Sequence, residues 1–278
     1  MRYLSANQFE VYEEIGKGGF GVVYKALDKV TKCPVAIKQI DLESTDDIDS
    51  LQKEIKILSQ CKLKQITQYF GCFVKGYKLW IIMELLDGGS CLDMLVAGPI
   101  REKCIAVLFK ELLIALDYLH SNGKIHRDIK AANILLNSQG DVKIADFGVS
   151  TQLSNNLSRR NTFVGSPYWM SPEVILEEEY NFKADIWSLG ITALELATGK
   201  PPLSNIPPMK ALFKIPENDP PILEGQEFSQ DFKQFVALCL QKSPQNRPSA
   251  KRLMKTKFIQ NAGKTSIVGD LIKRRQVW

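Results

Sequence analysis

One polar segment of the chain holds the side chains that phosphoryl transfer requires. Asp128 can orient or deprotonate a substrate hydroxyl, and Lys130 can reach the phosphoryl group during transfer. Asn133 and, further on, Asp146 offer the oxygen atoms that magnesium prefers. Phosphoryl transfer depends on positioning and charge neutralisation more than on covalent chemistry. Each residue alone would be an ordinary surface residue, but their order and spacing are typical of a catalytic loop followed by a metal-binding turn.

A glycine-rich segment, Gly16–Val23, precedes this loop and could hold a triphosphate, because glycine lets the backbone approach phosphate oxygens closely. The same glycine spacing occurs in dinucleotide-binding turns, but those open a helix, whereas here an alternating strand begins at Val22. Lys38 can contact the α- and β-phosphates, and Glu54, in an expected amphipathic helix, can pair with it. As isolated residues both would be surface charges, yet their place between the glycine segment and the catalytic loop favours a functional role.

Apolar positions near these residues predict a pocket for a purine ring. Val23, Ala36 and Leu135 would enclose the adenine. The backbone of Glu84 and Leu86 would hydrogen-bond the ring edge. The whole predicted nucleotide-binding set is Ile15, Gly16, Gly18, Gly21, Val23, Ala36, Lys38, Glu54, Met83 (at the back of the pocket), Glu84, Leu86 and Leu135.

A polar stretch downstream of the metal-binding turn predicts a switch, although its plain interpretation is a surface loop. Thr162 is the predicted phosphorylation site, since a phosphate there would bring about two negative charges. Arg127, next to Asp128, could bind that phosphate in a bidentate pair. Ordering the loop and setting Asp128 would then be one event. Other hydroxyls in the same region are Ser154, Ser158 and Ser166.

Composition and charge disfavour several other classes of protein. The chain has 278 residues, of which 45% are apolar and 24% charged, which is ordinary for a globular protein with a sizeable core. The net charge is +5, but Lys and Arg are scattered, so no nucleic-acid partner is expected. We expect no membrane span, because no apolar run approaches ~20 residues, and the first residues lack the apolar core of a signal peptide. Irregularly spaced cysteines fit reduced thiols, so we expect a cytoplasmic protein.

The hydrophobic pattern predicts a strand-rich first part and a helix-rich second part. Strands are expected at 9–15, 22–26, 35–40 and 79–83, with an amphipathic helix at about 46–60. Apolar helices are expected at 106–119 and 187–197. The expected organisation is an α+β, two-lobed fold with an N-lobe over 1–83, a hinge over 84–88, a C-lobe over 89–262 and a helical tail over 263–278.

The tail is expected to be one amphipathic helix with Ile267, Leu271 and Ile272 on its apolar face. It could simply dock on the large lobe, or it could bind a partner or an acidic surface.

The motifs together resemble those of serine/threonine protein kinases of the sterile-twenty-related, germinal-centre family, subgroup three, which has fungal members. The resemblance covers nearly the whole chain, with the kinase domain expected over 9–259. The stretches that carry it are Ala36–Glu43, Lys78–Glu84, Asn161–Gly165, Lys183–Gly190 and Asn246–Pro248. Departures from the family pattern are Ser166 and Ser171, where Thr and Ala are usual, and a missing His-Pro-Asn before Ile66.

The resemblance implies activity, cofactors and partners as well as fold. ATP and Mg²⁺ are the implied cofactors, and proteins phosphorylated on Ser or Thr are the implied substrates. An armadillo-like scaffold of the mouse-protein-25 family is the implied partner, with roles in polarity, septation or the cytoskeleton. The resemblance also implies a buried pair between Glu173 and Arg247 and structural roles for Arg127 and Asp185.

Two other functions compete with an active protein kinase. A catalytically weak scaffold of the same fold would be expected to lack Lys38, Asp128 or Asp146, and the chain has all three. A phosphotransferase for small molecules would not need the Thr162 loop or the segment around Glu173.

Overall fold

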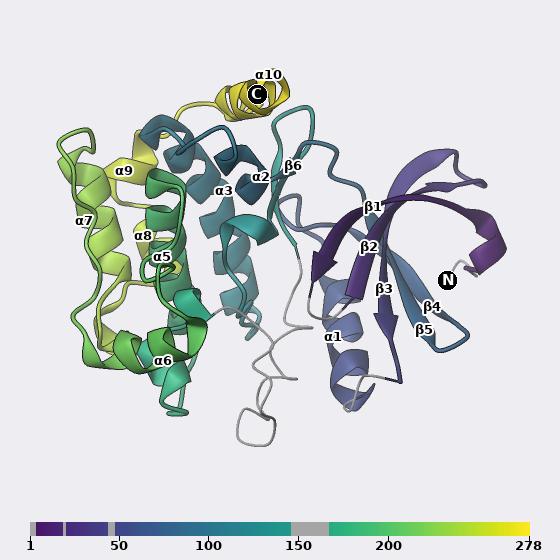
Figure 1. Ribbon diagram of the computed structural model, residues 1–278, viewed down its shortest axis with the longest axis horizontal. Helices are drawn as coiled ribbons and strands as arrows, with labels where there is room; N and C mark the ends of the chain where they lie inside the picture. Colours follow the sequence, from purple (N-terminus) through teal and green to yellow (C-terminus); the bar gives the residue numbers. More distant parts are fainter. Residues whose placement is uncertain (1–3, 19–20, 44–47, 146–166) are drawn as a thin grey trace. The chain divides into compact units, whose positions relative to one another are not determined.

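A computed structural model describes residues 4–18, 21–43, 48–145 and 167–278, which form two compact units (Figure 1). The first unit contains the described residues up to Asp87, and the second contains 88–145 and 167–278. The first is built mainly of strands and the second mainly of helices, so the predicted α+β fold is confirmed.

The first unit is a five-stranded antiparallel sheet with one α-helix beside it (Figure 1). The strand order is β1-β2-β3-β5-β4. The strands are β1 (Phe9–Gly18), β2 (Gly21–Asp28), β3 (Cys33–Asp41), β4 (Tyr69–Lys75) and β5 (Lys78–Glu84), and the helices are the 3₁₀ turn η1 (Ala6–Gln8) and α1 (Ile48–Gln60). All four strands expected from the alternating pattern are present, and each is longer than expected because cross-strand pairing extends beyond the apolar residues.

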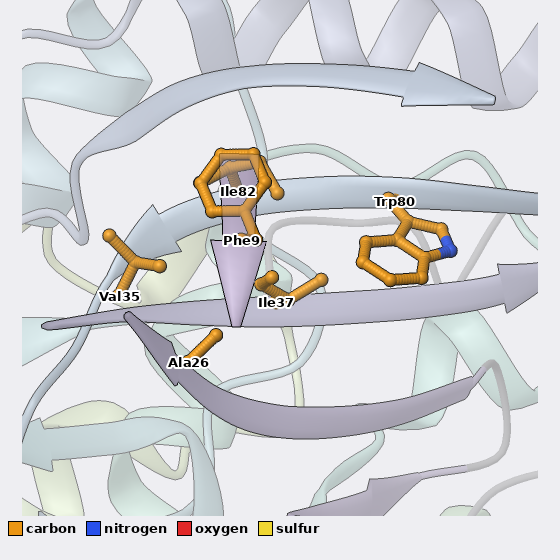
Figure 2. Close-up of a cluster of buried hydrophobic side chains, with 6 residues drawn as sticks. All are labelled: Phe9, Ala26, Val35, Ile37, Trp80 and Ile82. Atoms are coloured by element: carbon orange, nitrogen blue, oxygen red, sulfur yellow. The ribbon is translucent and has the colours of Figure 1, made fainter. Parts of the chain in front are cut away.

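Each face of this sheet has its own core, because side chains alternate along every strand. On one face, the buried side chains shown in Figure 2 pack together; they are Phe9, Ala26, Val35, Ile37, Trp80 and Ile82. On the other face, Ile40, Leu79 and Ile81 pack against Leu51 of α1. The sheet is therefore held from both sides, which fixes its register.

The second unit is built around two long helices, α3 (Glu102–Ser121) and α5 (Lys183–Thr198). Every residue of α5 from Ala184 to Ala197 is buried. Gly199 ends α5 at a φ of 91°, where its N–H donates to Glu195 O at 2.8 Å. No helix in the described part of the chain is long and apolar enough to cross a membrane.

Shorter elements surround these two helices. The helices are α2 (Cys91–Leu95), α4 (Pro172–Ile175), α6 (Pro208–Glu217), α7 (Gln230–Cys239), α8 (Ala250–Leu253), α9 (Lys257–Gln260) and α10 (Gly269–Val277). The 3₁₀ turns are η2 (Ala131–Asn133), η4 (Pro167–Trp169), η5 (Pro244–Asn246) and η6 (Thr265–Val268). A three-stranded sheet joins β6 (Gly89–Ser90), β7 (Ile134–Leu136) and β8 (Val142–Ile144) in that order.

The C-terminal tail differs from the single helix that the sequence predicts. Its first part is the 3₁₀ turn η6, and the α-helix begins only at Gly269. The cause is close docking of the backbone, since an added Cβ on Gly140 would lie 3.1 Å from Thr265 O, and the Cys104 thiol lies 4.0 Å from Ile267 O. A segment this short has little helical preference of its own, so its contacts decide its shape.

Arg274 of α10 holds this helix against α2 and the residues that follow α2. The Arg274 guanidinium donates to the carbonyl oxygens of Pro99 at 2.9 Å, Gly98 at 2.9 Å and Met94 at 3.3 Å. These carbonyls lie at and beyond the C-terminal end of α2, where a helix leaves acceptors without intrahelical partners. Leu271 is buried beside these contacts, so the geometry supports docking on the large lobe rather than a free partner-binding segment.

We expect Arg274→Ala to lower the Tm by a few degrees, because several hydrogen bonds to a charged donor are lost, worth roughly 1.5–3 kcal/mol each at most. Differential scanning calorimetry measures this. Lys273→Ala, at an exposed neighbouring position, is the matched control and should leave the Tm unchanged. Equal Tm values for the two variants would show that Arg274 does not anchor the tail.

Candidate active site

In the first unit, residues from successive strands line up across the sheet. Gly16 of β1 is paired with Val23 of β2. Val23 is paired with Lys38 of β3, and Lys38 with Ile81 of β5. Directly opposed residues share a face, and neighbouring strands lie about 4.8 Å apart. The sheet therefore brings the glycine segment, Val23 and Lys38 together, as a phosphate-contacting row requires.

Lys38 lies on the face of the sheet that α1 covers. Its cross-strand partner Ile81 packs against Leu51 of α1, and the Lys38 side chain is only 7% exposed. A buried ammonium group needs compensating partners, and Lys38 has interactions in the structure. The side chain of Glu54 lies outside the described residues, so the pairing of Lys38 with Glu54 stays a prediction.

Different physical constraints explain the glycines of the glycine-rich segment Gly16–Val23. Gly21 has a φ of 150°, and a Cβ there would lie 2.1 Å from Gln39 O, so packing of β2 on β3 requires glycine. At Gly16 a Cβ would meet only Val23, at 3.8 Å, so packing of the described residues does not require glycine. Gly18 is the last residue of β1, and the two residues after it lie outside the described part.

The predicted purine-contacting residues occur on several strands of the first unit and on β7 of the second unit. Ala36 is paired with Met83, so both lie on one row of the sheet. The amide of Glu84 donates to Gln68 O at 2.9 Å, which fixes the end of β5. Ile15 is 47% exposed, and Leu86 is buried. Leu135, half-buried on β7, belongs to the second unit.

The catalytic loop of the second unit holds both oxygens of one carboxylate. Lys130 Nζ lies 2.9 Å from Asp128 Oδ1. Asn133 Nδ2 donates to Asp128 Oδ2 and to the Asp128 backbone oxygen, each at 2.8 Å. The Asp128 and Lys130 side chains are 24% and 25% exposed, so the group remains accessible. The structure therefore brings Asp128, Lys130 and Asn133 together, as the sequence predicted.

His126 connects this carboxylate to the segment that precedes Asp146. Its imidazole is fully buried, with Nδ1 accepting from Asp128 N at 3.2 Å and Nε2 lying 3.0 Å from Ala145 O. An acceptor at Nδ1 and a donor at Nε2 describe a neutral ring. Asp146 itself lies outside the described residues, as does Thr162.

A buried aspartate on α5 holds the start of the catalytic loop. Asp185 accepts from His126 N at 2.9 Å and from Arg127 N at 2.8 Å, and His120 Nε2 lies 2.8 Å from it. Burial alone would raise the pKa of Asp185, but the hydrogen bond and charge of His120 and the hydrogen bond from the Arg127 amide lower that pKa below its ordinary value. Stabilisation from Asp185 is therefore present above the ordinary carboxyl pKa and is lost as the pH falls through the lowered value.

Arg127 has a φ of 72°, which is uncommon for a residue with a side chain. Its N–H bond to Asp185 holds this conformation, and its guanidinium lies 5.6 Å from the ring centre of Tyr180.

Three further polar residues of α5 each form a hydrogen bond with a group outside this helix. The Ser188 hydroxyl donates to Trp169 O at 2.7 Å. The Thr192 hydroxyl lies 2.7 Å from Ser188 O and 3.2 Å from Ile129 O. Glu195 Oε2 accepts from Ala131 N at 3.0 Å and from Trp169 Nε1 at 2.9 Å.

These three polar positions form one stripe on α5. With Asp185, they are spaced at i, i+3, i+7 and i+10, which places them on one face of the helix. Sequence reasoning missed His120, Ser188, Thr192 and Glu195; the signal that could have found the last three is polar residues at helical spacing within an otherwise apolar helix.

The expected pair between Glu173 and Arg247 is present and buried. Arg247 Nη1 donates to Glu173 Oε1 at 2.6 Å, and Nη2 donates to Oε2 at 2.9 Å. The remaining guanidinium hydrogens go to the backbone oxygens of Gln241, Lys183 and Lys242. All five donors of Arg247 are therefore used.

Comparisons with known proteins agree with this geometry. The model of the family described as "Protein kinase domain" matches residues 9–259. The serine/threonine-protein kinase sid1 of Schizosaccharomyces pombe is 50% identical over 275 residues, covering 98% of this chain and 58% of the relative. The serine/threonine-protein kinase dst1 of Dictyostelium discoideum is 50% identical over 267 residues, covering 95% of this chain and 36% of the relative. The serine/threonine-protein kinase ppk11 of S. pombe is 48% identical over 277 residues, covering 99% and 89%.

The chain belongs to the protein kinase domain family. Within that family, its relatives place it in the sterile-twenty-related, germinal-centre group. It spans 58% and 36% of the length of the first two relatives.

We expect Arg247→Ala to destabilise the protein by about 3–5 kcal/mol, since it leaves the buried Glu173 carboxylate without its partner. This corresponds to a fall in Tm of roughly 10 °C, measured by thermal unfolding. Lys251→Ala, exposed on α8, is the control. A fall of less than about one degree would mean that the pair contributes no more than a surface ion pair.

Proposed function

We propose that the chain is an ATP- and magnesium-dependent protein serine/threonine kinase that transfers the γ-phosphoryl group of ATP to Ser and Thr hydroxyls of proteins. The observation that carries the proposal is the arrangement around Asp128, in which Lys130 contacts one carboxylate oxygen and Asn133 the other. The three relatives are all named serine/threonine-protein kinases, which supports the substrate class.

In this proposal Asp128 accepts a hydrogen bond from the substrate hydroxyl and orients it toward the phosphoryl group. Lys130 and Asn133 keep the carboxylate from rotating, because each holds a different oxygen. Lys130 also supplies positive charge where negative charge develops on the transferred group. Fixed geometry of this kind is the main contribution that a protein makes to phosphoryl transfer.

The residues present fit magnesium and ATP. Asn133 donates both of its hydrogen bonds to Asp128 through Nδ2. The Oδ1 atom of Asn133 is therefore directed away from Asp128, and an amide oxygen is a suitable ligand for Mg²⁺. Asn133 and Asp146 would hold the ion, which neutralises phosphate charge when bound. Lys38 and the backbone around Gly16 would hold the phosphates. A Cβ at Gly16 would contact only Val23, so there is room beside this residue, which fits the role.

Regulation, partners and location are part of the same proposal. They are activation by phosphorylation of Thr162, binding of an armadillo-like scaffold of the mouse-protein-25 family, a cytoplasmic location and signalling in polarity, septation or the cytoskeleton. The hinge at 84–88 and the tail from 263 complete the proposed domain organisation. The resemblance to the subgroup supports these statements.

We expect Asp128→Asn to reduce kcat by roughly 10²–10⁴, because an amide accepts the substrate proton poorly. Phosphorylation of myelin basic protein with labelled ATP measures the change. Isothermal titration should give a nucleotide affinity within a few-fold of the wild type. Asp219→Asn, exposed in the second unit, is the matched control. Normal turnover by the Asp128 variant would exclude this mechanism.

Assays of the wild-type protein separate the competing functions. A wild-type protein that phosphorylates only small alcohols or aminoglycosides would favour the small-molecule phosphotransferase. A wild type that binds ATP without any transfer would favour the scaffold.

We expect Thr162→Ala to lower activity strongly, whereas Ser154→Ala and Ser158→Ala leave it near the wild-type value. A phosphate on Thr162 would form one to three charge-assisted bonds and offset the entropy of ordering its loop. Mass spectrometry after incubation with ATP and Mg²⁺ should find phosphate on Thr162 in the wild type but not in Asp146→Ala. Full activity of Thr162→Ala without added scaffold would contradict the assignment.

A further inference from the structure

The C-terminal tail contacts the three-stranded sheet of the second unit at two separate places. At one, Thr265 O of η6 lies 3.1 Å from the position that a Cβ on Gly140 would take, in the turn between β7 and β8. At the other, Ile272 Cδ1 of α10 lies 3.0 Å from the position that a Cβ on Gly88 would take, directly before β6. The tail therefore extends from the β7–β8 turn to the start of β6.

The contact at Gly88 is a close approach between a side chain and the backbone. Gly88 does not have a positive φ, so its own conformation does not require glycine. A Cβ there would lie 2.7 Å from Leu136 O of β7 as well as 3.0 Å from Ile272 Cδ1. Ile272 is 9% exposed. Its terminal methyl group therefore packs beside the hydrogen bond that Gly88 N donates to Leu136 O at 2.9 Å.

The strands at this contact carry residues that the proposed nucleotide site requires. β6 pairs with β7 through Gly89 and Leu136 and through Ser90 and Leu135, and Leu135 is the residue predicted to contact the purine ring. Asn133, a proposed ligand of magnesium, directly precedes β7. Because β6 is only two residues long, a contact at its start has a large influence on how it lies against β7.

We propose that Ile272 is a positioning residue for the nucleotide, because its Cδ1 methyl group holds Gly88 against β7 and so fixes Leu135 against the purine ring. The proposal rests on the proposed kinase function and extends the nucleotide site to a residue of the C-terminal tail.

Ile272 is not needed to hold the tail itself. Arg274 donates to three carbonyl groups at and beyond the end of α2, and Val268 and Leu271 are buried. Arg275 is a weak second contact with the same segment, since its Nη1 lies 3.5 Å from Gly88 O and its side chain is 43% exposed. What Ile272 adds is the buried apolar contact with Gly88.

The first test shortens the Ile272 side chain in two steps. Ile272→Ala should weaken binding of MgADP about tenfold, and Ile272→Val, which removes only Cδ1, about threefold, in line with the buried carbon atoms removed. Isothermal titration measures both affinities. KM for ATP should rise by similar factors, with kcat and KM for myelin basic protein unchanged.

The matched control is Ile267→Ala, which makes the same truncation in the η6 part of the tail, where the backbone lies beside Cys104 of α3. This variant should lower the Tm and leave the affinity for MgADP at the wild-type value. An equal loss of affinity in Ile267→Ala and Ile272→Ala would mean that a loosened tail, and not the contact at Gly88, is responsible, and would overturn the proposal.

The second test changes the other side of the contact. Gly88→Ala should also weaken binding of MgADP, because its Cβ would displace Leu136 O or Ile272 Cδ1. Combined with Ile272→Val, its effect should be less than additive, since both substitutions act on one contact. Additive effects would show that Ile272 and Gly88 act independently, contrary to the proposal.

A third readout needs neither nucleotide nor kinase activity. Amide hydrogen exchange at Gly88 should be faster in Ile272→Ala than in Ile267→Ala, and equal exchange would overturn the proposal. If the wild type bound MgADP no more tightly than Ile272→Ala, the positioning role would fail and the proposed function would stand. If the wild type phosphorylated no Ser or Thr substrate, the proposed function would fail, and the MgADP affinities would still decide the role of Ile272.

Discussion

The catalytic loop depends first on a buried carboxylate. Asp185 accepts two consecutive backbone N–H groups, at His126 and Arg127, and lies 2.8 Å from His120 Nε2. Arg127 has the positive φ of 72°, which a residue with a side chain adopts only when surrounding structure holds it. Asp128 follows at once, so the direction in which the candidate catalytic carboxylate points is set by Asp185. An ionised Asp185 is favoured because the donors outweigh the effect of burial on its pKa.

The polar stripe on α5 and the irregular catalytic loop satisfy each other. A helix buried from Ala184 to Ala197 cannot carry unpaired polar side chains without a large free-energy cost. A loop without regular structure likewise needs partners for its backbone groups. Positions 185, 192 and 195 of the helix meet loop positions 126–127, 129 and 131, in the same order along both segments. The helix α5 is thus both the centre of the core of the second unit and the element whose side chains hold the backbone of the loop in place.

Sequence patterns singled out residues that belong to a motif and missed residues that only the tertiary structure brings into contact. Asp128, Lys130 and Asn133 were selected for their spacing, and the structure places them within hydrogen-bonding distance of one another. The alternating strands around Lys38 followed from periodicity. Glu195 was missed because a Glu in an apolar helix has no motif; only its spacing from Asp185 points to it. The tail was mispredicted as one helix because the docking of Thr265 beside Gly140 is a tertiary contact that local periodicity does not contain.

Asp185 and Glu195 show how the number of donors decides the state of a buried carboxylate. Both lie on α5, and burial would raise the pKa of each. Asp185 has donors on both oxygens, and its pKa is lowered. Glu195 accepts from Ala131 and Trp169 through Oε2, and its pKa is raised. Asp185 therefore stabilises the fold as a charged group, whereas the charge of Glu195 opposes folding.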